Sequence, residues 1–302
     1  MTDAAAGAFS TKKEFLKKFG KKSGGRMLAR RFLKNKTGVI GLCVFLLIVL
    51  VALFAPLIAG YEDVAIKVDV PGRLHPPSAE HILGTDEMGR DLLARIVHGA
   101  RISLIVGITS IGMALLLGGV LGSISGYFGG VVDNIIMRFM DVFLCLPDVL
   151  LALAIIATFG TSQVNLIISI GLAFTPKLSR IVRTSVMSVR SNEYVEAARS
   201  IGARTSHIIA AHVLINCVGP IIVQVTLYVS NAILTISALS FIGLGIQAPT
   251  PEWGNMLASG RAFMRDHAYL VMAPGLAIFF TILSLNLLGD GLRDTLDPRL
   301  KM

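Results

Sequence analysis

Long runs of uncharged, mostly apolar residues alternate with short polar segments along this chain. Three runs, 38–59, 102–125 and 268–289, hold 22, 24 and 22 residues without an Asp, Glu, Lys or Arg. About 20 apolar residues cross the hydrocarbon core of a bilayer as a helix, so each run is long enough for one span. The pattern therefore predicts an all-α protein that crosses a membrane several times.

Two further uncharged runs, 149–176 and 213–251, exceed the length of one span. The polar residues 160–165 (GTSQVN) divide the first run into a hairpin with one helix on each side. The second run is interpreted as one helix followed by a Gly- and Pro-rich re-entrant or surface segment, GLGIQAPTPEWGN. The sequence thus predicts a polytopic membrane protein with six transmembrane helices, the first at 38–60 and the other five in a core at 101–290.

Basic residues are concentrated ahead of the first span. Residues 1–37 hold eleven Lys and Arg against two acids, whereas the rest of the chain holds 17 residues of each sign. Lys and Arg accumulate in cytoplasmic loops, which predicts cytoplasmic tails at 1–37 and 291–302 and an extracytoplasmic segment at 61–100. Six basic residues then fall in outside loops: Lys67, Arg73, Arg90, Arg95, Arg261 and Arg265. The first span is too long for a cleaved signal peptide and is interpreted as a retained anchor.

Composition limits the chemistry that this chain can perform. Only 16% of its residues are charged, against about a quarter in soluble proteins. Three scattered cysteines lie in or beside predicted spans, which suits small buried apolar positions: Cys43, Cys145 and Cys217. His207 and His212 are five residues apart and are not expected to share a helix face. The sequence predicts no metal site, no cofactor bound by this chain and no catalytic constellation.

A short helix is predicted just ahead of the second span. Either Thr85 or Asp86 is placed to cap a helix that runs from Glu87 towards His98. Its buried side would carry Leu92, Leu93 and Ile96. We interpret this segment as an amphipathic helix that lies on the membrane surface.

Glycines and charges mark the second and third spans. Gly118, Gly122 and Gly126 recur every four residues, which forms a ridge that lets another helix approach closely, and GYFGG at 126–130 predicts a tight turn. Three charges follow in the third span: Asp133, Arg138 and Asp141. A charge at the centre of a span costs about 2.5–3.5 kcal/mol, so these should lie at the surface or form pairs. For the deeper Asp148, pairing with Arg138, helix capping and a role in transport remain open.

A polar stripe runs along one face of the fifth span. Four residues fall at positions i, i+4, i+7 and i+11, on one helix face: Gln224, Tyr228, Asn231 and Thr235. Polar groups within a bilayer face a cavity or another helix rather than lipid. The stripe predicts residues that line a translocation path, with hydrogen bonding between helices as the alternative.

The loop at 186–215 is long and polar, yet it contains helix signals. Asn192 is placed to cap a helix that begins at Glu193, and Gly202 is placed to end it. One apolar face would carry Tyr194, Ala197, Ala198 and Ile201. Thr205 or Ser206 is placed to cap a second helix over 207–215 that leads into the fifth span. The expected structure is a helix, a glycine corner and a second helix, suited to docking in a groove on a partner.

The segment EYVEAARSIGA resembles the EAA loop of the membrane permease subunits of ATP-binding-cassette (ABC) importers, with Glu196, Ala197, Ala198 and Gly202 at the positions of the motif. The later Leu-Pro element of that loop is weaker here, where INCVGP stands. From about residue 28 onward, an ordered set of further motifs resembles the second, C-type permease of the dipeptide/oligopeptide/nickel group. These are LGTDEMGRD, GARISL, GYFGG, MRFMD, GLGIQAPTPEWG and NLLGDGLRDTLDP.

The resemblance implies a type I ABC importer permease fold in the inner membrane of the cell. It also implies partners: a second permease that completes the path, two ATPase subunits that bind ATP and Mg, and an extracytoplasmic substrate-binding protein. The ATPase would be coupled through Tyr194, Glu196, Ala197, Ala198, Arg199, Ile201 and Gly202. The chain has no Gly-x-x-x-x-Gly-Lys-Ser/Thr pattern, so it is not expected to hydrolyse ATP itself.

Two other classes of protein fit the sequence less well. A membrane-embedded hydrolase needs a nucleophile with a base or clustered metal ligands, and neither is present in the sequence. A self-contained secondary transporter would have no use for an ordered docking helix. The cargo stays open among dipeptides, longer peptides, glutathione and nickel chelates.

Overall fold

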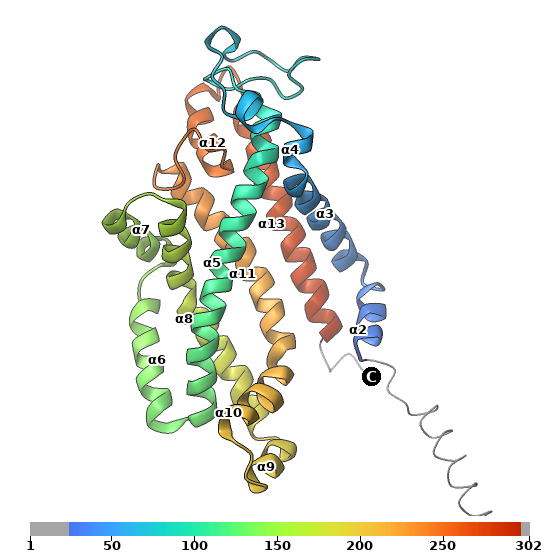
Figure 1. Cartoon of the computed structure of the whole chain (residues 1–302), viewed down its shortest axis with the longest axis vertical. Coiled ribbons are helices and arrows are strands. Elements are labelled where there is room, and N and C mark those ends of the chain that lie inside the picture. Colours follow the sequence, from blue (N-terminus) through green and yellow to red (C-terminus); the bar gives the residue numbers. More distant parts are fainter. Residues whose placement is uncertain (1–23, 297–302) are drawn as a thin grey trace, which may run out of the picture.

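The computed structural model describes residues 24–296 and consists of helices joined by short loops (Figure 1). The rest of both predicted tails, 1–23 and 297–302, lies outside the described residues. Five helical segments are long and apolar enough to cross a membrane, and a bent helix pair is long and apolar enough to make a sixth crossing if it forms one span. These segments are built from α3 (Lys36–Leu53), α5 (Leu92–Phe128), α6 (Gly130–Leu144), α7 (Asp148–Phe159), α8 (Gln163–Arg190), α11 (Ile215–Phe241) and α13 (Tyr269–Leu296).

The shorter elements gather at the two ends of the bundle (Figure 1). One end carries α2 (Gly24–Phe32), α9 (Glu193–Ser200), α10 (Thr205–His207) and the π-helical turn η3 (Ile208–Leu214). The other end carries α4 (Ala55–Ile58), the π-helical turn η1 (Tyr61–Ala65), α12 (Trp253–Gly260) and two 3₁₀ turns, η2 (Val70–Gly72) and η4 (Arg261–Phe263). We call residues 191–214 the elbow, and residues 55–91 with 242–268 the cap.

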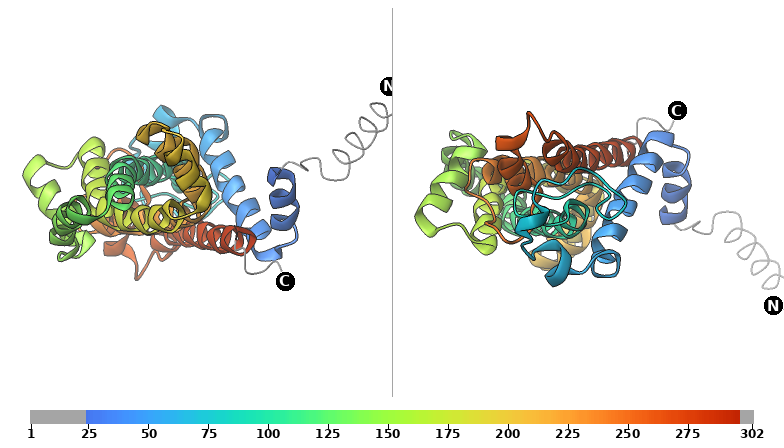
Figure 2. Two further views of the ribbon diagram at one scale, coloured as in Figure 1. Left: turned by 90° about the horizontal axis from the view of Figure 1, so that it is seen from below. Right: turned by 90° about the horizontal axis from the view of Figure 1, so that it is seen from above.

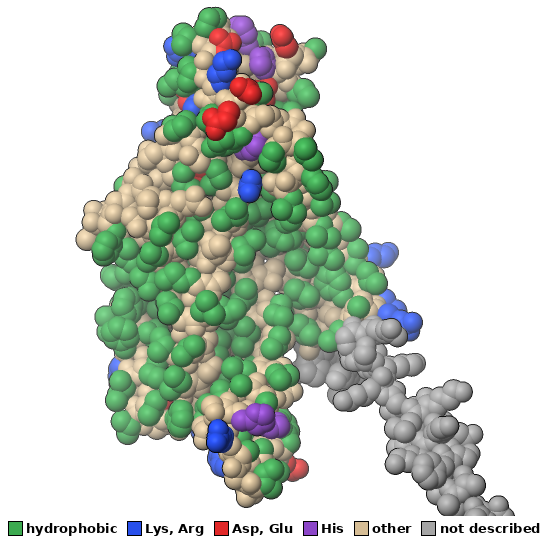
Figure 3. Space-filling model, viewed as in Figure 1, with side chains coloured by type: hydrophobic (Ala, Val, Ile, Leu, Met, Phe, Trp, Pro, Cys, Tyr) green, Lys and Arg blue, Asp and Glu red, His purple; other side chains and the backbone are tan. Residues whose placement is uncertain are grey.

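The surface divides into the zones that a membrane protein requires. Hydrophobic side chains cover the middle of the molecule, while most charged and histidine side chains lie over the cap and the elbow (Figure 3). Viewed from either end, α6 and α7 lie at one edge of the bundle, and α2 and α3 lie at the opposite edge (Figure 2). The central helices α5, α8 and α11 hold fully buried side chains such as Ile111, Phe174 and Ile233.

The glycine ridge on α5 is the reason that α5 and α8 form the most extensive helix pair. A Cβ atom added at Gly118 would lie 2.7 Å from the carbonyl oxygen of Thr175, and one at Gly126 would lie 2.7 Å from that of Arg183. At Gly122 the α8 backbone is closer still. The predicted close approach of another helix to this ridge is confirmed.

The first span is held against the last. Asn35 caps α3 by accepting a hydrogen bond from the backbone N–H of Gly38, and its side-chain amide donates to Asp294 on α13 over 2.9 Å. Gly38 also lies against Gly291, where an added Cβ would be 2.9 Å from the Gly291 Cα. The start of α3 is thereby fixed to the end of α13.

The predicted separate helix over 87–98 is wrong. Helix α5 begins at Leu92, where the Asp91 carboxylate accepts from the backbone N–H of Ala94, and it continues unbroken to Phe128. Residues 85–91 instead form a compact loop around Asp86, which accepts from the backbone N–H groups of Met88 and Arg90. No proline stands between His98 and the second span, and the single Gly99 does not interrupt the helix, so the predicted surface segment and the span form one helix.

The third span is not straight. The turn between α5 and α6 falls at Gly129 and Gly130, both with positive φ, as the GYFGG motif predicts. However, α6 and α7 meet at 83°, with the break next to Pro147. Proline lacks an N–H donor and disfavours helix in the residue before it, which explains the bend. The break predicted at 160–165 is present, since Ser162 caps α8.

Candidate functional site

The elbow joins α8 to α11 and forms a capped helix with a sharp corner. The main chain of Asn192 occupies the N-cap position of α9, but its side chain donates to the Tyr194 hydroxyl over 3.4 Å instead of capping the helix. At the other end, Gly202 has φ +77° and donates its N–H to the carbonyl of Arg199. Glycine adopts this left-handed conformation without penalty, so the predicted glycine corner is confirmed and the Asn192 side-chain cap is not.

The apolar residues of α9 divide between two faces, not the single face expected. Val195 and Ala198 turn inward, at 0% and 7% exposure, into a small core formed with the ends of α5, α8 and α11. Tyr194 and Ile201 turn outward, at 44% and 84% exposure, and Ala197 is exposed beside them. The i, i+3 pair Val195 and Ala198 attaches the helix to the bundle, which leaves an apolar surface free.

Two arginines tie the elbow to the end of α5. The Arg199 guanidinium lies over the Tyr127 ring, 5.5 Å from its centroid, and donates to the Tyr127 hydroxyl. Arg190, at the end of α8, donates to the carbonyls of Gly126 and Tyr127. Arg199, expected among the coupling residues, thus also contacts α5, and like Glu196 and Gly202 it is exposed.

The second half of the elbow departs from the prediction in its winding. Arg204, not Thr205 or Ser206, occupies the N-cap position, and no side chain caps this helix. The chain then winds as a π-helix from Ile208 before α11 begins. Residues five apart share a face in this winding, so the rings of His207 and His212 meet edge to face with centroids 5.6 Å apart. The expectation that these histidines would not share a face is therefore wrong.

Ion pairs fasten the bent α6–α7 span to α8. Asp133 receives two hydrogen bonds of 2.5 Å from Arg183, and it also accepts from the Ser125 hydroxyl. Two further pairs lie along the same pair of segments, Asp141 with Arg180 at 2.7 Å and Asp148 with Lys177. For Asp148, of the alternatives left open, pairing with Arg138 is thereby excluded. The sequence signal for the pairs is the three-residue spacing of Lys177, Arg180 and Arg183 on α8.

The polar stripe on α11 is present on one helix, and its members have different partners. Asn231 and Thr235 form hydrogen bonds with backbone carbonyls of their own helix, those of Leu227 and Asn231. Tyr228 packs edge to face on Phe174, with ring centroids 5.7 Å apart. None of these contacts joins a polar side chain of the stripe to a polar group of another helix. The stripe therefore remains a candidate wall of a path.

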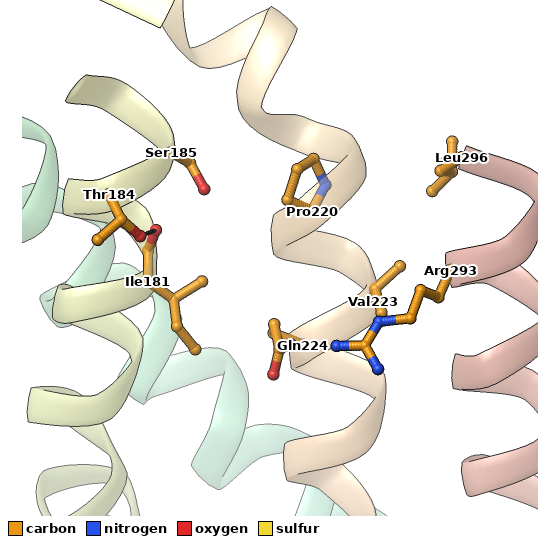
Figure 4. Close-up of a pocket in the computed structure, with 8 residues that line it drawn as sticks. All are labelled: Ile181, Thr184, Ser185, Pro220, Val223, Gln224, Arg293 and Leu296. Atoms are coloured by element: carbon orange, nitrogen blue, oxygen red, sulfur yellow. Dashed lines mark hydrogen bonds between the residues drawn. The ribbon is translucent and has the colours of Figure 1, made fainter. Parts of the chain in front are cut away.

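Gln224, the first residue of the stripe, lines a pocket of about 400 Å³ between α8, α11 and α13 (Figure 4). Its lining residues lie near the end of α8, the start of α11 and the end of α13, and the elbow joins the first two of these. Its wall combines apolar and polar side chains, among them Ile181, Thr184, Ser185, Pro220, Gln224 and Arg293. Sequence reasoning did not single out Arg293, because only the folded chain brings the end of α13 beside α11.

The cap is organised around two buried arginines. Asp86 pairs with Arg90 at 2.7 Å and with Arg95 at 3.2 Å, and these three side chains are at most 5% exposed. Arg95 also donates to the carbonyls of Ala65 and Pro249, which joins the two sequence segments of the cap. The LGTDEMGRD motif thus forms a buried structural centre.

A second buried corner of the cap is the start of helix α12. The Glu252 carboxylate is fully buried and accepts from the backbone N–H groups of Gly254 and Asn255. Trp253 is also buried, and its indole N–H donates to the carbonyl of Ile96 on α5 over 3.0 Å. Burial raises the pKa of the Glu252 carboxyl, and the two backbone hydrogen bonds only partly oppose the rise.

A neutral Glu252→Gln variant is expected to change how stability depends on pH. A carboxyl whose pKa is raised by folding contributes its full stability below the unfolded pKa and loses it as pH rises through the folded pKa. Relative to the variant, the wild type should therefore lose thermal stability over the pH range that begins at the ordinary pKa of a glutamate carboxyl, about 4.3, and extends upward. Melting temperatures of both proteins across this range provide the test. The same pH dependence of the melting temperature in the wild type and in Glu252→Gln would contradict this prediction.

The cysteines and histidines form no metal centre in the described part of the chain, where no group of three or more His, Cys, Asp or Glu side chains could hold an ion. Cys217 is buried as expected. Cys43 and Cys145 are exposed, contrary to the expectation of buried positions. Both lie on outer surfaces of the bundle, where an apolar thiol can face lipid.

Solved structures with this fold are the membrane subunits of ABC transporters. The chain superposes on the inward-facing MetNI methionine ABC transporter with a TM-score of 0.56 and 13% identity, covering 67% of this chain and 97% of that one. An amino acid ABC transporter gives a TM-score of 0.53 at 13% identity, with 67% and 94% covered. At this level of identity the likeness establishes the fold, an ABC permease fold of type I.

Sequence relationships define the family. Residues 118–302 match the model of the binding-protein-dependent transport system inner membrane component, and residues 23–77 match the N-terminal TM domain of oligopeptide transport permease C. This chain belongs to the family of binding-protein-dependent transport system inner membrane components, and it is a multi-pass permease subunit of an ABC importer. The C-type resemblance is thereby confirmed.

The relatives carry peptide-transport names. The dipeptide transport system permease protein DppC of Alkalihalophilus pseudofirmus is 44% identical over 89% of this chain and 88% of its own length. The di/tripeptide permease DppC of Pseudomonas aeruginosa is 46% identical, with 89% and 90% covered. The glutathione permease GsiD of Pectobacterium atrosepticum is 40% identical, with 90% of both chains covered.

Proposed function

We propose that this permease imports dipeptides and other short peptides across the inner membrane. The names and identities of the DppC relatives support this cargo. In this proposal the chain forms the translocation path together with a second, similar permease. An extracytoplasmic binding protein delivers the peptide at the cap, and two separate subunits bind and hydrolyse ATP with Mg. Glutathione, itself a peptide, is the second candidate because GsiD is 40% identical.

The elbow is the observation that carries the coupling part of this proposal. Its helix is held to the bundle by Val195 and Ala198, while Tyr194 and Ile201 remain exposed at the tip of the molecule. Large apolar side chains on a rigid helix suit docking into a groove, where a few central residues supply most of the binding energy. We propose that this surface, with Glu196, Ala197 and Gly202 around it, docks on an ATPase subunit. The elbow and both chain ends then lie on the cytoplasmic side.

Ile201→Asp is expected to uncouple the importer without unfolding it. The side chain is 84% exposed, so the substitution disturbs no internal packing. Loss of a central docking residue typically costs about 2 kcal/mol or more, which weakens ATPase binding at least about 30-fold. The measurement is co-purification of the ATPase subunits together with ATP-dependent uptake of a labelled dipeptide into membrane vesicles.

Val70→Asp is the matched control, because Val70 is 63% exposed and lies in the cap, at the opposite end of the molecule. This variant should retain its ATPase subunits. Normal ATPase retention and uptake with Ile201→Asp would refute the docking surface. Uptake of labelled glutathione in preference to dipeptide by the wild type would replace the proposed cargo and leave the docking surface standing.

A further inference from the structure

The pocket between α8, α11 and α13 has the size and composition of a small-ligand site. Its volume of about 400 Å³ falls within the range of about 300–1,000 Å³ that ligand pockets occupy. Arg293 extends from the last turn of α13 towards α11, on the side where Gln224 lies, and Thr184 and Ser185 face the pocket from α8 (Figure 4). Three transmembrane helices thus contribute polar groups to one space.

The polar groups that converge there are available to a ligand. Within residues 24–296, the side chains of Arg293 and Gln224 form no hydrogen bond or ion pair, whereas Arg180, Arg183 and Arg190 are all engaged. The Thr184 hydroxyl donates to the carbonyl of Ile181 over 2.9 Å and can still accept. An arginine in the last turn of a helix also interacts favourably with the helix dipole. The dipole interaction needs only a positive charge, so a lysine variant separates it from recognition of a ligand by the guanidinium.

The chemistry of the wall defines the ligand. The planar fork of guanidinium N–H donors matches the two oxygens of a carboxylate, and a cation would be repelled. Gln224 supplies an amide donor and acceptor for a peptide group, and Ile181, Pro220 and Val223 offer apolar contact for side chains. The combination fits a short peptide with a free α-carboxylate.

The pocket also contains the first residue of the polar stripe of α11. Gln224 lines it, and Tyr228, Asn231 and Thr235 continue along the same helix face away from the elbow. We propose that Arg293 and Gln224 form a binding site for the α-carboxylate end of the transported peptide, in the half of the path nearest the elbow. This inference rests on the proposed import of peptides. Arg293 then determines specificity, because its guanidinium favours peptides with a free α-carboxylate over peptide amides.

The site can be tested by thiol labelling of the assembled transporter in membrane vesicles. Ser185→Cys places a thiol in the pocket, in a background in which the exposed Cys43 and Cys145 are changed to Ser. Relative to their rates with free cysteine, an anionic thiosulfonate reagent should be favoured about tenfold over its cationic counterpart, because a fixed positive charge concentrates anions. Alanylalanine should slow this labelling, and alanylalaninamide should not.

Variants of Arg293 assign these effects to its guanidinium. Arg293→Gln should abolish the preference for the anionic reagent. Arg293→Lys should keep that preference but need about tenfold more alanylalanine for protection, since the bidentate geometry is lost. Arg138→Gln, at an exposed arginine on α6 outside the pocket, is the matched control and should change neither result.

The outcomes separate the site from the proposed function. Equal protection by the peptide and its amide, or an anion preference that survives Arg293→Gln, would overturn the carboxylate site. Peptide uptake is measured in the same vesicles. Normal uptake without protection refutes this pocket and leaves peptide import intact, whereas protection without uptake retains the pocket and refutes import.

Discussion

Gly122→Ala is expected to prevent α5 and α8 from packing as they do in the wild type. The added Cβ would meet the carbonyl oxygen of Ser179 and the backbone N of Arg183, both main-chain atoms of α8 that no side-chain rotation can move. Overpacking of a well-packed core costs about 1–3 kcal/mol, and occasionally more. A clash with backbone belongs at the upper end, so we expect a loss of about 3 kcal/mol.

Gly119→Ala is the matched control on the same helix. Its Cβ would meet only the end of the Leu115 side chain, at 4.0 Å. Alanine is favoured over glycine within a helix by about 1 kcal/mol, so this variant should be as stable as the wild type or more stable. Thermal unfolding in detergent, followed by size-exclusion chromatography, measures both. Equal melting temperatures for the two variants would show that the helices are not held together at this ridge.

Asp133→Ala is expected to have the second large effect, through the ion pair with Arg183. Asp133 is 8% exposed and accepts two hydrogen bonds from the guanidinium and one from Ser125. Removal of one partner of a buried pair leaves an uncompensated charge and costs about 3–5 kcal/mol. The guanidinium retains 25% exposure, so we expect roughly 3 kcal/mol and loosening of α6 from α8.

The neighbouring pair provides a matched comparison. Arg180 and Asp141 are 55% and 45% exposed, so Arg180→Ala should cost less than about 1 kcal/mol. Combining Asp133→Ala with Arg183→Leu should restore part of the lost stability, because the orphaned charge is removed. The test compares the melting temperatures of the wild type, Asp133→Ala, Arg180→Ala and the double variant. If the double variant is no more stable than Asp133→Ala alone, the loss does not arise from an uncompensated Arg183.

The sequence predicted those parts of the fold that depend on local composition. Uncharged runs located the spans, and the spacing of Gly118, Gly122 and Gly126 located the main helix contact, because both signals are properties of one segment. Gly202 was identified for the same reason, since a positive φ at a helix end selects glycine regardless of distant contacts. The EAA resemblance then supplied the family, which the family model confirms.

Features that depend on distant residues escaped prediction. Nothing near Asp133 in the sequence identifies Arg183, fifty positions away, as its partner. The bend before α7 was missed because residues 149–159 are apolar enough to continue a straight span. The winding of Ile208–Leu214 brought together two histidines that regular α-helical spacing separates. The pocket beside Arg293 required three helices to be in place.

Helix α5 is a single rod that connects both ends of the transporter. Its 37 residues extend about 55 Å. At one end Tyr127 contacts Arg199 of the elbow, and at the other Arg95 and Ile96 contact the cap at Pro249 and Trp253. A stiff body held at both ends transmits tilt over its whole length without any relay of side chains. If the elbow moves with an ATPase subunit as proposed, a rigid α5 would carry that movement to the cap as a tilt about its crossing with α8 at Gly118–Gly126.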